Sequence, residues 1–330
     1  MEIDKREAIT ASNLGPVVSL LTWIMEAAVV IAVGVKFTLS SIIPGRRNRE
    51  DAVLFFATVF SIGFTVSMSV AVPNGIGRHQ DTLSTNQLET LQKGVYSANI
   101  LLVLVSSSVQ ASVLIFFHEI TPDFFHLRFI YALAVLMTLF CISSFFVAAF
   151  PCASPSVWGI LGTQCIDQLS FWEVFAAVNI VIEGALILFP VLVVYPLTMK
   201  KRRKAIVISC FAVRIIVIGA FVAQFYEAQI LKSHIVDRTF HIWKYLLTTV
   251  FVQALSIITV CIPYIRNLLL GMESGMIQTG HFRLPSRQGI DTEISLRRIT
   301  VDETSTNLSG SADPKLEEST ISHGKKDGRI

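Results

Sequence analysis

The sequence has few charged residues for its length. Only 15% of its 330 residues are Asp, Glu, Lys or Arg, whereas ordinary soluble domains contain about 25%. Hydrophobic residues make up 52% of the chain, more apolar surface than a water-soluble fold could cover. A soluble globular class is therefore excluded, and the net charge of +3 gives no indication of a nucleic-acid partner.

The motifs of common catalytic, nucleotide and metal sites are also missing. HExxH, the Walker-type glycine loop, GxSxG and CxxC do not occur in the chain. No metal site is expected, because the spacing between Cys152 and Cys165 contains no His or further Cys. The last apolar segment has no lysine near its middle, so it lacks the usual Schiff-base anchor for retinal. We expect no bound cofactor.

What the sequence does contain is a series of seven long apolar blocks bounded by charged residues, Pro or Gly. A segment of about 20 apolar residues, rising 1.5 Å per residue, crosses an apolar bilayer core about 30 Å thick. The sequence therefore predicts an all-α, polytopic membrane protein with seven transmembrane helices. We place them near Pro16–Ile43, Ala52–Val72, Val95–Phe117, Phe129–Phe150, Phe171–Leu197, Ala205–Ala228 and Tyr245–Leu270.

Basic residues in the short connections predict the orientation, since they resist translocation. Arg46, Arg47 and Arg49 lie in the first connection, and residues 200–204 of the fifth read Lys-Lys-Arg-Arg-Lys. The fourth connection, residues 152–170, has no Lys or Arg. We expect the first and fifth connections in the cytosol, and the fourth connection and the N-terminus outside.

Three regions follow along the chain. Residues 1–15 form a polar extracellular segment without a signal-peptide core, and residues 16–270 form the helix bundle. Residues 271–330 are rich in Ser, Thr, Gly and charged residues, with too little apolar surface to order themselves. We predict that this last region is a disordered cytosolic tail.

Polar residues inside the apolar blocks are the candidate site residues, because a charge at the bilayer centre costs about 2.5–3.5 kcal/mol on insertion scales. By residue counting, four of them share one layer in the outer half of the bundle: Glu26, Asn179, Glu183 and Gln253. They would form a ligand pocket centred on Glu183, or they would serve as interhelical hydrogen bonds.

Two of the basic residues inside the apolar blocks have predicted roles. Arg214 lies within the sixth block, where its long side chain would either pair with Glu183 or reach cytosolic water alone. Lys36 lies near the inner end of the first block, and we expect it to extend its ammonium group towards the membrane surface.

Cys152 and Cys165 lie in the fourth connection, on the side where disulfides persist. We predict a disulfide between them, with two free thiols as the alternative.

Pro190 and Pro263 each remove a backbone donor from a spanning helix, which predicts a kink at each. The kink would be either a fixed bend or a hinge.

Several short segments together resemble the fungal rhodopsin-domain integral membrane proteins, which include Pth11-like seven-transmembrane receptors. These segments are Gly75-Ile76-Gly77-Arg78-His79, the two cysteines around Trp158, Pro190 followed by the basic run, and residues 261–269. The chain departs from the usual pattern at Gln110, Glu183 and Gln253, where members often carry Lys, Asp and Glu. The resemblance implies a multi-pass protein of the plasma membrane or an endomembrane, proposed to act as a receptor. The family name refers to the helix count and does not imply retinal.

These observations favour a receptor-like protein that binds an extracellular small or lipophilic cue and signals to the cytosol. Its expected partners are the lipid bilayer, an unknown small-molecule ligand, and a G protein or other cytosolic signalling protein. The alternative is a membrane-embedded enzyme or transporter for a lipophilic metabolite, in which Glu26 and Glu183 would move protons. The receptor interpretation is preferred because no catalytic motif was found, and seven helices without an inverted repeat argue mildly against a transporter.

Overall fold

Seven long helices make up the computed structural model. It describes residues 15–42, 49–77, 83–121, 124–152, 166–194, 208–209, 211–233 and 238–273. The helices are α1 (Gly15–Ile42), α2 (Arg49–Ala71), α3 (Thr85–Ile120), α4 (Phe124–Ala149), α5 (Gln168–Val194), α7 (Ile215–Ser233) and α8 (Arg238–Glu273). No β-strand occurs among these residues.

Each of the seven helices is long and apolar enough to cross a membrane, which confirms the predicted all-α class and the number of spans. One of the two largest differences lies at α3, which begins at Thr85, ten residues before the predicted start at Val95. Hydropathy missed these turns because they are polar. A capping box starts the helix: the Ser84 hydroxyl accepts from the Gln87 N–H, and the Gln87 side chain accepts from the Ser84 N–H.

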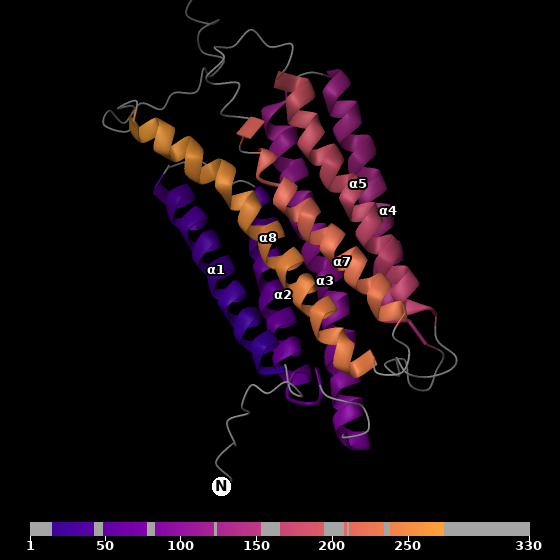
Figure 1. Cartoon of the computed structure of the whole chain (residues 1–330). Helices are drawn as coiled ribbons and strands as arrows, with labels where there is room; N and C mark the ends of the chain where they lie inside the picture. Colours follow the sequence, from indigo (N-terminus) through magenta and orange to yellow (C-terminus); the bar gives the residue numbers. More distant parts are fainter. Residues whose placement is uncertain are drawn as a thin grey trace, which may run out of the picture. The chain divides into compact units, whose positions relative to one another are not determined.

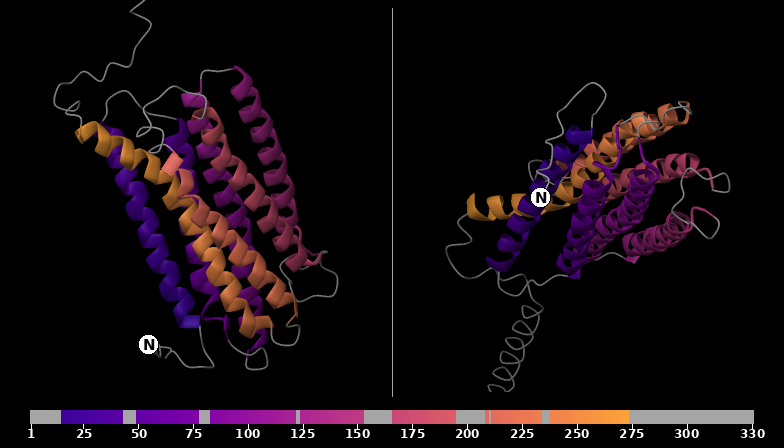
Figure 2. Two further views of the ribbon diagram at one scale, coloured as in Figure 1. Left: turned by 45° about the horizontal axis from the view of Figure 1, so that its top comes forward. Right: turned by 90° about the horizontal axis from the view of Figure 1, so that it is seen from below.

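Successive helices run in opposite directions through the bundle (Figure 1). We call the side where α1 begins the first side and the side where α1 ends the second side; by the predicted orientation, the second side is cytosolic. Helix α2 packs along α3, α5 packs along α7, α1 lies against α2, and α3 lies against α4. Figure 2 shows the same bundle from two further directions.

Glycines allow α2 and α3 to pack closely. A Cβ added at Gly94 would lie 2.8 Å from the Ala71 Cβ, so no larger residue fits there without movement. The turn after α2 uses Gly75 and Gly77 at φ values of 131° and 76°, a region that other residues rarely adopt. Ile76 between them is fully buried. This geometry gives a physical reason for the Gly-Ile-Gly sequence after α2.

The outward faces of the helices carry large apolar side chains. Val181 is 72% exposed, and Val135, Phe55 and Ile215 are also exposed. Exposed apolar surface on this scale is unfavourable in water but matches the hydrocarbon of a bilayer. The outer surface of the bundle therefore faces lipid.

The chain divides into two compact units, Met1–Leu270 and Gly271–Ile330. The bundle belongs to the first. Residues 1–14 and 274–330 lie outside the described residues, so the extracellular segment and the disordered cytosolic tail stay predictions.

Candidate functional site

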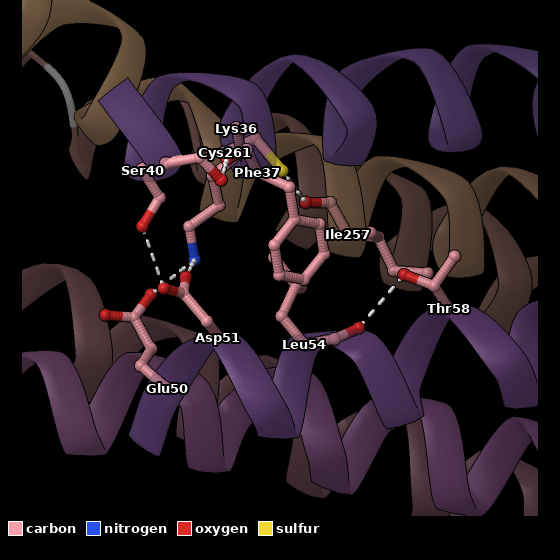
Figure 3. A network of polar contacts seen from close by, with 10 residues as sticks. Lys36, Phe37, Ser40, Glu50, Asp51, Leu54, Thr58, Ile257 and Cys261 are labelled. Carbon is pink, nitrogen blue, oxygen red and sulfur yellow. Dashed lines mark hydrogen bonds and ion pairs between the residues drawn. The ribbon is translucent and has the colours of Figure 1, made fainter. Parts of the chain in front are cut away.

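A buried charged network joins α1 to the start of α2 on the second side (Figure 3). The Lys36 Nζ lies 2.9 Å from Glu50 Oε1 and 3.2 Å from Asp51 Oδ1. The Ser40 hydroxyl donates to Asp51 Oδ2 at 3.0 Å. Figure 3 also shows Cys261 of α8, whose thiol donates to Ile257 O at 3.5 Å.

The expectation that Lys36 extends towards the membrane surface is wrong. Its side chain and that of Glu50 are both 0% exposed. Lys36 turns inwards because two carboxylates at the start of α2 offer it charge-assisted hydrogen bonds within the protein. These carboxylates were not recognised from the sequence because they stand beside Arg49, at the edge of a charged connection.

A second buried ion pair joins α5 to the segment before α7. Arg214 Nε donates to Glu183 Oε2 at 2.8 Å, and Nη2 donates to Oε1 at 2.8 Å. The side chains are 2% and 1% exposed. The structure thus brings Glu183 and Arg214 together in a bidentate pair, the geometry that a planar guanidinium favours with a carboxylate.

Arg214 does not lie within a continuous sixth helix, as the sequence had suggested. Val213 and Arg214 form a turn, and α7 begins at Ile215. Short-range hydrogen bonds define the break: Arg214 N donates to Phe211 O at 3.0 Å, and Ile216 N donates to Val213 O at 3.1 Å. The break places the guanidinium against α5.

Glu26 and Gln253 meet at one residue of α2 in the middle of the bundle. Glu26 Oε2 accepts from the Ser61 hydroxyl at 2.6 Å and from the Thr65 hydroxyl at 3.1 Å. Gln253 Nε2 donates to the Ser61 hydroxyl oxygen at 2.9 Å. This network connects α1, α2 and α8. The sequence interpretation missed Ser61 and Thr65, which carry no charge to signal them.

Asn179 has a separate partner on α3. Gln110 Nε2 donates to Asn179 Oδ1 at 2.8 Å, and Asn179 Nδ2 donates to Phe175 O at 2.7 Å. The four predicted pocket residues are thus divided among three contacts: one around Ser61, one at Gln110 and one at Arg214. Each contact joins neighbouring elements, and a ligand pocket formed by the four residues stays a prediction.

The described residues test the cysteine and proline predictions only in part. Cys152 is disulfide-bonded. Its predicted partner Cys165 lies outside the described residues, so the pairing stays a prediction. Pro190 lies inside α5 and Pro263 inside α8, and the kinks expected there also stay predictions.

On the first side, a more exposed contact joins the end of α7 to the region where α5 begins. Lys232 of α7 lies 3.6 Å from Asp167 and 3.8 Å from Glu173, and it also donates to the Ser170 hydroxyl. Hydrogen bonds from Ser170 lower the pKa of the Asp167 carboxyl below its ordinary value, with a smaller contribution from Lys232. This contact provides a solvated comparison for the buried pair.

The part of the chain that the structure describes contains no group of three or more His, Cys, Asp or Glu residues able to hold a metal ion. Its buried polar groups instead connect helices. The fold and these contacts define the class: an integral, multi-pass membrane protein of seven helices.

Residues 27–271 match the fungal rhodopsin domain, and the chain belongs to this family. The match covers nearly the whole bundle and agrees with the resemblance noted in the sequence. No curated protein matches the chain.

Proposed function

We propose that this protein is a receptor-like membrane protein that senses a small or lipophilic cue and signals to the cytosol. The observation that carries the proposal is the buried Glu183–Arg214 pair between α5 and the turn before α7. Both partners lie on elements whose ends reach the second side, where the predicted orientation places cytosolic partners.

A buried ion pair favours distinct helix arrangements over intermediate ones, because the paired and the separated states of its charges differ greatly in free energy. Separating the charges would leave each one unpaired in a medium of low dielectric, which is costly. The charges are therefore either paired or moved together to new partners. A ligand that contacts the two arrangements differently would shift their populations.

The enzyme or transporter alternative assigned proton transfer to Glu26 and Glu183. Both Glu183 oxygens accept hydrogen bonds from Arg214. A carboxylate held in this way is a fixed partner for a cation and a poor proton carrier. This contact argues against Glu183 as the proton carrier in that alternative.

The test compares Glu183→Gln with Glu173→Gln in the full-length protein. Both residues lie on α5 and face a cation on the α7 side, but Glu173 is 17% exposed and its partner Lys232 is 45% exposed, whereas Glu183 is 1% exposed. Spin labels at Leu192 and Ile216, which are exposed positions on α5 and α7, would report the distance between these helices. Second-messenger levels and metabolite profiles would be measured in the same cells.

We expect Glu183→Gln to change both the label distance and the second-messenger level, and Glu173→Gln to change neither. A metabolite that accumulates or disappears with Glu183→Gln, while second-messenger levels stay constant, would instead support the enzyme or transporter.

A further inference from the structure

A small hollow lies between the two buried ion pairs on the second side. Its lining includes Glu50 and Arg214 together with apolar side chains such as Phe116, Phe211, Val260 and Pro263. The space is about 10 Å³, close to what one water molecule needs. The hollow therefore has one charged residue from each ion pair in its wall.

Each of these charged residues has one polar atom that its ion pair leaves unused. Glu50 Oε2 is buried and has no hydrogen-bond partner, although Oε1 of the same carboxylate contacts Lys36. Arg214 Nη1 is also buried without a partner, although Nε and Nη2 contact Glu183. Leaving a buried polar atom unpaired is unfavourable, and more so when the group is charged.

We propose that this hollow is a binding site for a water molecule that bridges Glu50 and Arg214. The water accepts a hydrogen bond from Arg214 Nη1 and donates one to Glu50 Oε2. One molecule thereby satisfies both unused atoms, and water sites in proteins are polar cavities with two to four such partners. The proposal concerns the architecture of the bundle and goes beyond the proposed receptor function.

A metal cation would not suit the same hollow. The guanidinium in its wall repels positive charge and can only donate hydrogen bonds. Thr259, which also lines the hollow, uses its hydroxyl proton on Ser256 O at 3.1 Å and keeps lone pairs for accepting. The lining therefore supplies one strong donor and two acceptors, which matches water.

The bridge would join two separate ion pairs into one network. Lys36 and Glu50 connect α1 with α2, and Arg214 connects to α5 through Glu183. With the water in place, hydrogen bonds and ion pairs connect α1, α2, α5 and the turn before α7. A change in one ion pair would then reach the other through two hydrogen bonds.

Radiolytic hydroxyl labelling of the full-length protein in lipid nanodiscs tests the site, because hydroxyl radicals form where water is bound. Phe116 and Phe211 line the hollow, whereas Phe64 and Phe221 are buried in apolar surroundings and serve as controls. We expect oxidation of Phe116 and Phe211 to be several-fold higher than that of the two controls. Equal labelling of all four rings would overturn the proposal.

Two substitutions at Val260 separate a bound water from bulk solvent. Val260→Ile adds a methyl group that displaces the water, so labelling of Phe116 and Phe211 should fall to the control level. Val260→Ala enlarges the hollow and should preserve or increase labelling. Unchanged labelling in Val260→Ile would mean that bulk water reaches the rings, and the site would be rejected. If Val260→Ile does not fold, the comparison of the four rings in the unaltered protein still decides the outcome.

Discussion

Arg214 Nη2 and Glu183 Oε2 lie 2.6 Å apart, and neither side chain is more than 2% exposed. The pair connects α5 to a turn where the chain interrupts its helical path. Its contribution to stability depends on both partners, because removing either residue leaves the charge of the other buried and unpaired.

Removing only the positive partner should be costly. Arg214→Met leaves the Glu183 carboxylate buried without its cation, and we expect the free energy of unfolding to fall by about 3–5 kcal/mol. Replacing both residues, as in Glu183→Leu with Arg214→Met, should cost less because no charge remains. Thermal unfolding of the purified proteins in detergent measures both effects. A double variant that is less stable than Arg214→Met would contradict this account.

The same reasoning applies to Lys36, with an exposed lysine as the control. Lys36→Met leaves Glu50 buried and unpaired, so we expect a loss of about 3–5 kcal/mol in the free energy of unfolding. Lys93 also pairs with a glutamate, but that pair is 53% and 50% exposed. Lys93→Met should therefore cost no more than about 1 kcal/mol. Equal losses at the two positions would argue against a buried pair at Lys36.

Alanine substitutions at two glycines should affect the free energy of unfolding differently. At Gly94 the new Cβ would lie 2.8 Å from Ala71 Cβ and 3.1 Å from the Ser67 carbonyl oxygen. We expect Gly94→Ala to destabilise the α2–α3 pair by about 1–3 kcal/mol. At Gly34 nothing lies within 4 Å, so Gly34→Ala should be neutral or stabilise by up to about 1 kcal/mol. Chemical denaturation in mixed micelles would show whether the two signs differ.

Sidedness can be measured with epitope tags in intact cells. We expect a tag after Ile330 to resist external protease until the plasma membrane, or the endomembrane vesicle, is opened. A tag before Met1 should be accessible to protease from outside the cell, or from the lumenal side of opened vesicles. The expectation follows from the basic residues of the first and fifth connections. The reverse result would place α1 the other way round and put the Lys36–Glu50 pair on the outer side.

Hydropathy predicted the seven spans because lipid contact requires long apolar segments whatever the neighbouring helices do. It could not predict the start of α3, where a capping box and polar turns extend the helix beyond the apolar block. It also missed the break before α7, since Val213 and Arg214 contain neither Gly nor Pro to mark a turn.

Side-chain partners were harder to predict than spans, because they depend on how each helix is rotated about its axis. Counting residues placed Glu26 and Asn179 at one depth, but they face different helices. The pairing of Glu183 with Arg214 was among the alternatives because only one cation lay within reach. Glu50 received no role, since its neighbours in the sequence made it look like part of a loop.

Helix α3 has 36 residues and is therefore about 54 Å long, well beyond an apolar core of about 30 Å. Its first turns extend past neighbouring helices on the first side (Figure 1). These capped helical turns provide a rigid epitope outside the membrane on the first side. An antibody fragment that binds these turns would add mass in a defined orientation. Such added mass helps to align particle images of a small membrane protein in electron microscopy.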